Sequence, residues 1–106
     1  MARFRIKQND LLPAIRVTVV GAGDLTGADV EFHMRTREGV VVVNAAGSVE
    51  SYDADTDTNV LRYDWAEGDT ATDGSFQAEF QATEDGKPLT VPTRGFHSVV
   101  IYPEIA

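Results

Sequence analysis

Apolar and polar residues alternate along most of this chain, in short segments separated by clusters of turn-forming residues. The clearest example is a pair of alternating segments joined by a loop rich in Gly, Asp and Thr at residues 66–74. A side-chain period of two is what a half-buried β-strand requires, because successive side chains point to opposite faces. We therefore predict two strands whose inward faces supply the core: Leu61, Tyr63 and Trp65 on the first, and Phe76, Ala78, Phe80 and Ala82 on the second.

The same alternation predicts further strands near residues 4–6, 15–19, 30–34, 89–91 and 96–102. Asp85 and Gly86 form a dipeptide that favours a two-residue hairpin between the strands on either side. Residues 40–43 are four consecutive valines. We expect this β-branched run to be buried or paired on both faces, with residues 45–51 as a weaker continuation of it.

No segment has the period and length of an amphipathic helix, so about seven to nine short strands make up the predicted fold. This pattern is typical of a β-sandwich or a small barrel, and we favour an all-β antiparallel sandwich. The 106 residues fit one domain spanning residues 1–106, because two separate cores would each be too small to be stable without metals or disulfides.

The net charge of −8 opposes broad attraction to nucleic acid or to anionic membrane lipids, so we expect neither as a partner. The chain contains no Cys, which excludes disulfides and thiolate metal sites. Pro13 and Arg16 interrupt the apolar run that a secretory leader would need, so we expect folding in the cytoplasm. No run approaches the length of a membrane-spanning helix.

The Asp-rich segment at residues 53–59 is the strongest candidate for a metal site. Asp53, Asp55 and Asp57 occupy the first, third and fifth places of a calcium-loop pattern, and Asp64 occupies the twelfth. The sixth place is Thr58 instead of Gly, and no helices flank the segment, so the EF-hand pattern fails. A solvated turn is the favoured interpretation, with an irregular calcium loop as the alternative.

Nothing in the sequence nominates a catalytic centre or a cofactor. His33 is expected on an exposed strand face, and His97 is in phase with core residues, so we expect it to cap one end of the core. None of the serines lies in a nucleophile elbow. The Gly-rich residues 21–27 lack the Gly-Lys-Ser/Thr of a phosphate loop and are predicted to form a turn.

The surface of such a sandwich offers strand edges as interaction sites. We expect the first and the final strands to be unpaired edges, with Arg3, Arg5, Lys7 and Tyr102 as candidate contact residues. Two interpretations stay open for the basic residues, since they either dock a neighbouring protein or keep the edge soluble. Tyr52 and Tyr102 are the aromatic residues best placed for contacts on the surface.

Several motifs together resemble a family of bacteriophage tail domains, the N-terminal module of phage baseplate upper proteins. They are Lys7-Gln-Asn-Asp10 with Pro13, Asp24-Leu-Thr-Gly-Ala-Asp-Val30, Tyr63-Asp-Trp-Ala-Glu-Gly-Asp-Thr70, Gly74-Ser-Phe-Gln-Ala-Glu-Phe80, Asp85-Gly-Lys87 and Pro92. The resemblance covers nearly the whole chain, but its motifs are turn and core residues. It implies an immunoglobulin-like β-sandwich that is not an enzyme and is used in building virions.

The resemblance therefore predicts a phage or prophage structural protein that folds in the host cytoplasm and joins a tail, baseplate or other part of the virion. Its expected partners are other virion proteins and further copies of itself, and no cofactor is expected. The alternative is a calcium-dependent or carbohydrate-binding β domain that uses Asp53, Asp55, Asp57 and exposed aromatic residues.

Overall fold

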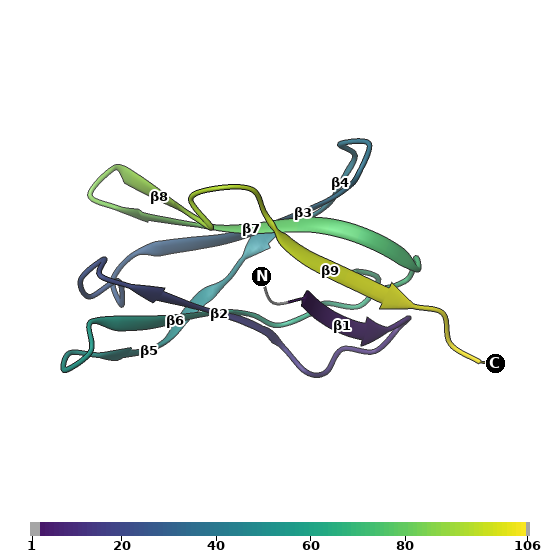
Figure 1. Ribbon diagram of the computed structural model, residues 1–106, viewed down its shortest axis with the longest axis horizontal. Helices are drawn as coiled ribbons and strands as arrows, with labels where there is room; N and C mark the ends of the chain where they lie inside the picture. Colours follow the sequence, from purple (N-terminus) through teal and green to yellow (C-terminus); the bar gives the residue numbers. More distant parts are fainter. Residues whose placement is uncertain (1–2, 106) are drawn as a thin grey trace.

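A computed structural model describes residues 3–105 and contains nine strands in two sheets packed face to face (Figure 1). Sheet A has six strands in the order β1-β9-β7-β3-β4, with β8 also paired to β7; sheet B has three, in the order β2-β6-β5. The strands are β1 (Arg3–Lys7), β2 (Ile15–Val20), β3 (Asp29–Thr36), β4 (Val41–Ala46), β5 (Ser48–Asp53), β6 (Thr58–Tyr63), β7 (Gly74–Glu84), β8 (Lys87–Val91) and β9 (His97–Tyr102).

This architecture confirms the predicted all-β sandwich and its strand number, whereas the finer immunoglobulin-like assignment stays a prediction. Most strand pairs are antiparallel, and β1 alone among the described pairs runs parallel to its neighbour, β9. Strand β7 is the longest. One of its sides pairs with β3, while the other pairs first with β9 and then with β8. Asp85 and Gly86 have positive φ and form the predicted hairpin between β7 and β8.

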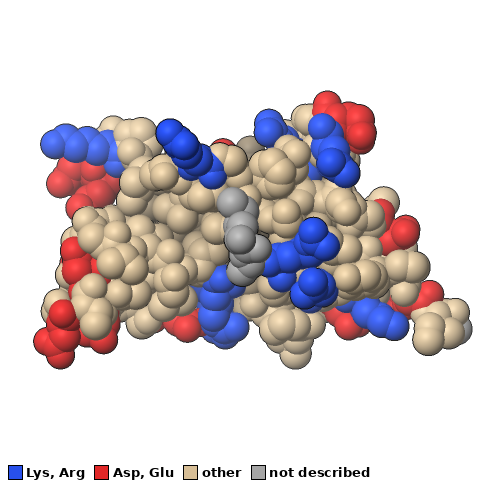
Figure 2. All heavy atoms as spheres, in the orientation of Figure 1, with Lys and Arg blue, Asp and Glu red and all other residues tan. Residues whose placement is uncertain are grey.

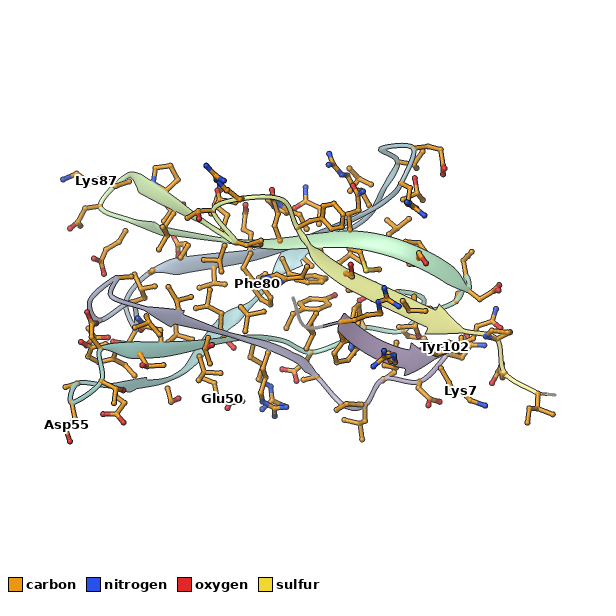
Figure 3. All side chains as sticks on the ribbon, in the orientation of Figure 1. Lys7, Glu50, Asp55, Phe80, Lys87 and Tyr102 are labelled. Carbon is orange, nitrogen blue, oxygen red and sulfur yellow. The ribbon has the colours of Figure 1, made fainter. Side chains whose placement is uncertain are left out.

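The core lies between the two sheets and is built on stacked aromatic rings. Phe32 of β3 stacks on Tyr63 of β6 with ring centroids 4.5 Å apart, so this pair joins sheet A to sheet B. Trp65 meets Phe32 edge-on at 5.6 Å, and Phe80 points into the space between the sheets (Figure 3). The predicted inward-facing residues are all buried: Leu61, Tyr63, Trp65, Phe76, Ala78, Phe80 and Ala82.

Three polar side chains in and near this core, those of Asn59, Trp65 and Thr70, bond to the loops that cover its ends. Buried Asn59 accepts a hydrogen bond from the Leu25 amide and donates one to the Gly23 carbonyl, which fixes the β2–β3 connection. At the opposite end, the Trp65 indole N–H donates to the Pro13 carbonyl and the Thr70 hydroxyl donates to the Asp10 carbonyl. Both loops are thereby held against the ends of the sandwich.

Three sequence predictions about strand boundaries and burial are wrong. Strand β6 ends at Tyr63, so Trp65 lies in the following loop, although it is buried as expected. Residues 45–51 do not continue the valine strand, because the chain leaves sheet A at Gly47 and enters sheet B as β5. Val40, Val41 and Val42 are exposed by 61%, 63% and 41%, and only the last valine of the run is buried.

The final strand is also not a free edge. Strand β9 lies between β7 and β1, and its residues pair with both neighbours. The physical reason is that the first strand folds back onto the last one in parallel, with Phe4 opposite Val99 and Ile6 opposite Ile101. Because Ile6 is buried, this pairing places an apolar side chain in the core as it closes the sheet.

Candidate interaction site

The four aspartates of the calcium pattern are not brought together. Asp53 ends β5, residues 54–57 form the turn between the paired strands β5 and β6, and Asp64 follows the far end of β6. Six residues of extended chain separate Asp64 from Thr58, a distance of about 20 Å. Within residues 3–105, no group of three or more His, Asp or Glu side chains is arranged to hold a metal ion.

The carboxylates of this turn already have local partners. Asp53 accepts a hydrogen bond from the Asp55 amide, and Asp57 accepts from both the Gly23 amide and the Tyr52 hydroxyl. The bond to Asp57 raises the pKa of Tyr52 above its ordinary value, because the neutral phenol is the donor. These contacts match the favoured interpretation of the segment as a turn held by side-chain-to-backbone bonds.

The two histidines lie on different strands of sheet A, His33 within β3 and His97 at the start of β9. His33 is on the outer face of sheet A, 3.3 Å from a carboxylate oxygen of Glu31. His97 opens β9, where its Nε2 is buried and makes no hydrogen bond within the described residues. Burial lowers the pKa of His97, since the charged ring would lose its hydration there.

The edge of sheet A at β1 carries the predicted basic residues. Arg3, Arg5 and Lys7 are exposed along the strand, while Ile6 between them is buried. Tyr102 lies opposite Lys7 in the parallel pairing and is 41% exposed, and Figure 3 shows the two close together. The structure thus places all four predicted contact residues, Arg3, Arg5, Lys7 and Tyr102, at one side of sheet A.

The opposite edge of sheet A, at β4, has a different surface. Strand β4 pairs with β3 on one side and with no described strand on the other. Its sequence from Val41 to Ala46 contains no charged residue, and Val40, Val41 and Val42 are exposed. A β-branched, uncharged and exposed edge of this kind is a template for adding a further strand.

The remaining edges of the described sandwich are protected. Sheet B ends in β2 and β5, where Arg16 and Glu50 form an ion pair across the strands at 2.7 Å. Arg62 of the central strand binds the same carboxylate at 2.9 Å, and together the two arginines lower the pKa of Glu50. The outer side of β8 carries Lys87 and Pro88, and proline has no N–H to donate. Strand β4 is therefore the least protected edge.

Sequence reasoning missed β4 because it interpreted consecutive valines as a sign of burial on both faces. The signal that could have corrected it is the neighbouring turn, since a run that begins just after Gly39 and ends just before Gly47 is short enough to be an edge. Which strands lie at the edge of a sheet depends on pairing between segments far apart in the sequence. The sequence of residues 40–46 alone therefore does not predict that this strand is an edge.

The outer face of sheet A is hollowed on both sides of Phe96, which belongs to the loop that crosses over β7 between β8 and β9 (Figure 1). The larger hollow, about 270 Å³, is lined by mixed residues that include His33, Arg35 and Glu79. The smaller one, about 180 Å³, is lined by Arg3 and Arg37 together with uncharged side chains.

Comparison with known proteins identifies no family. No family model matches the chain, and no curated protein matches it significantly. Among the described residues there is no helix long and apolar enough to cross a membrane.

Proposed function

We propose that this chain is a non-enzymatic structural protein of a bacteriophage or prophage virion, which makes protein–protein contacts in a tail, baseplate or related assembly. The virion assignment is supported by the resemblance of its turn and core motifs to the N-terminal module of phage baseplate upper proteins. The same resemblance supports an immunoglobulin-like topology for the sandwich. It further suggests that the protein folds in the host cytoplasm before it is incorporated.

The observation that carries the contact role is the exposed valine edge at β4. Monomeric proteins blunt their edge strands with charges, prolines or covering loops, because an open edge pairs with other chains. Within the described residues β4 has no charge, proline or covering strand, and its one irregularity is a register shift against β3 between Met34 and Arg35, whereas β1, β2, β5 and β8 each carry a charge or a proline. A neighbouring virion subunit that adds a strand to β4 would bury the valines and satisfy the free backbone groups.

Incorporation into virions tests the proposal directly. Phage particles from a strain that carries the gene would be purified by density gradient and analysed by mass spectrometry, with cryo-electron microscopy to locate the subunit. We expect the chain at a fixed copy number per particle. Particles that are complete without it would contradict the virion assignment, as would flanking genes that encode metabolic enzymes.

A lysine variant tests the role of the β4 edge. Val41→Lys combined with Val42→Lys places two charges on the edge without touching the core, so we expect a folded chain that is lost from purified particles. Thr18→Lys combined with Val20→Lys is the matched control, because it adds the same two charges at exposed positions of β2 on the other sheet. Equal incorporation of both variants would show that β4 is not the docking edge.

A further inference from the structure

The arginines of sheet A are aligned across its outer face by the strand register. Arg3 lies opposite Ser98, Ser98 opposite Gln77, and Gln77 opposite Arg35, so one row of side chains crosses β1, β9, β7 and β3. Four strands at about 4.8 Å spacing put the two arginines about 14 Å apart. Long guanidinium side chains on both sides therefore border a floor made of uncharged hydroxyl and amide groups.

The smaller hollow takes in the β1 side of this row: Arg3, Ser98 and Gln77 line it, whereas Arg35 donates a hydrogen bond to Gln77 and lines the larger hollow. The lining of the smaller hollow comes from Arg3 of β1, Arg37 after β3, and Ser75, Gln77, Ser98 and Phe96 between them, and its described lining contains no Asp or Glu. Arg3 and Arg37 make no ion pair with any residue in the range 3–105, whereas Arg16 and Arg62 are both paired. We call this site the arginine hollow. In a chain of net charge −8, it concentrates positive charge that no carboxylate among the described residues neutralises through an ion pair.

The complementary charge lies at one end of the same molecule. The connection between β2 and β3 and the turn between β5 and β6 are joined there by the bond from the Gly23 amide to Asp57. Residues 21–29 and 53–57 contain five aspartates and no Lys or Arg. Asp55 projects from the tip of the turn, at the lower left of Figure 3, and Figure 2 shows acidic atoms at that end. We call this the acidic end.

We propose that the arginine hollow of one copy receives the acidic end of a second copy. The acidic end protrudes and bears carboxylates, while the hollow is recessed and bears guanidinium groups with hydroxyl and amide donors, so shape and charge both match. The two surfaces are different parts of the chain, so the contact is heterologous and propagates into a ring or a filament. This arrangement rests on the proposed function, for which it specifies how copies of the subunit contact one another.

The contact is dominated by exposed charges, which makes its strength modest and dependent on salt. We expect the purified chain to form concentration-dependent oligomers in sedimentation velocity experiments at about 20 mM salt and to be monomeric at about 0.5 M salt, where screening is strong. A chain that stays monomeric at low salt up to the solubility limit would overturn the proposal.

Charge reversal identifies the surfaces. The hollow variant is Arg3→Glu with Arg37→Glu, and the end variant is Ala54→Lys with Asp55→Lys. Each alone brings like charges together and should be monomeric at low salt. Mixed in equal amounts, they should associate again, because every contact between unlike variants pairs opposite charges. Reversal changes the net charge from −8 to −12 (four units) in the hollow variant and to −5 (three units) in the end variant. Both variants remain negative, so attraction between opposite net charges cannot explain association of the mixture.

Two controls distinguish this contact from nonspecific association and from docking at β4. Lys7→Glu with Lys87→Glu changes net charge as much as the hollow variant does but lies outside the hollow, and we expect it to associate as the native chain does. Circular dichroism and melting temperature establish that each variant is folded. Association that persists in the hollow variant but disappears after Val41→Lys would place the contact at β4 and overturn the proposal. The association experiment uses purified chain, whereas the proposed function is tested by finding the chain in virions. A monomeric chain that is still present in virions would therefore overturn the proposed contact but not the proposed function.

Discussion

Sheet A ends in β1 on one side and in β4 on the other. Both are edge strands of the same sheet, but their exposed side chains are of different kinds. Strand β1 has a charged residue at every second position and a buried isoleucine between them. Strand β4 has no charged residue and exposes valines instead. Cations on the first edge oppose pairing with another strand, while the second edge carries no charge that would do so. The contrast teaches that the two edges of one sheet can have surfaces with different physics.

A similar contrast holds between β4 and β9, the two strands without Asp, Glu, Lys or Arg. Strand β9 is paired on both sides, by β7 and β1, so its uncharged sequence is hidden within the sheet. Strand β4 has the same kind of sequence but a single partner. The fold itself explains why β9 is uncharged, because the strand is paired on both sides. For β4, we propose that a neighbouring subunit supplies the second partner strand.

The largest expected effect comes from breaking the attachment of β1. Ile6→Ala removes a buried side chain that lies opposite Ile101, and we expect it to lower the free energy of unfolding by about 2–5 kcal/mol. The matched change in the other edge, Val41→Ala, removes exposed atoms and should cost less than about 0.5 kcal/mol. Urea unfolding followed by tryptophan fluorescence measures both. Equal losses of unfolding free energy in the two variants would mean that β1 and β4 contribute equally to the core.

The next effect concerns the point where β4 leaves the sheet. A Cβ at Gly47 would lie 2.9 Å from the Arg62 carbonyl oxygen and 3.2 Å from a Val30 methyl group, so Gly47→Ala requires a backbone shift. We expect a loss of about 1–3 kcal/mol in unfolding free energy. Gly27→Ala is the control, because nothing lies within 4 Å of its added Cβ. A Gly47→Ala variant as stable as this control would show that the crossing is not tightly packed.

A smaller change in stability but a clear change in solubility is expected from the β4 valines. Val41→Lys with Val42→Lys should alter unfolding free energy by less than about 0.5 kcal/mol, because both side chains are exposed. The same variant should reduce light scattering during prolonged incubation at high protein concentration, since edge lysines oppose strand addition. Replacing Arg5 and Lys7 of β1, which lie outside the arginine hollow, by Val should have the reverse effect and increase scattering.

The smallest expected effect is a pH dependence of the unfolding free energy caused by His97, which lies in β9, the strand next to β1. The pKa of His97 is lowered by burial in the folded chain and returns to about 6.5 on unfolding. As pH falls below about 6.5, the unfolded chain gains a proton that the folded chain does not, so stability decreases until the folded pKa is reached. Comparing unfolding at pH 7.5 and 5.5, each about one unit from 6.5, should show a smaller decrease for His97→Gln than for the native chain.

The control for this measurement is His33→Gln, which should keep the decrease. Strand β4 carries no ionisable side chain, so it contributes nothing to pH dependence in this range. A decrease of equal size in the His97→Gln variant would mean that another group is responsible.

The sequence predicts many of the residues of the candidate site, but not where they lie in the folded chain. The basic residues of β1 were predicted as a contact edge, and they are exposed. The prediction that the final strand shares this role as a free edge is wrong, because β1 covers it. The valine run is predicted from sequence to be buried or paired on both faces, but it forms an exposed edge with one partner strand. The arginine hollow was not anticipated, since Arg3 and Arg37 are more than thirty positions apart in the sequence.

The sequence by itself determined where most strands lie and, outside the valine run, which side chains of the alternating segments point inward. This is a local property, because the period of two is imposed by the geometry of the extended backbone and the turns are marked by Gly, Asp and Pro. Trp65, Tyr63 and Phe80 are buried in the structure as that pattern predicts.

Only the tertiary structure decided which strands are neighbours and which are left at an edge. Strands are joined by backbone N–H and C=O groups that every residue except proline carries alike, so a single strand's sequence does not specify its partner. The parallel return of β1 onto β9, the crossing at Gly47 and the open side of β4 all follow from packing the two sheets together. The surfaces proposed to make contacts are products of that packing.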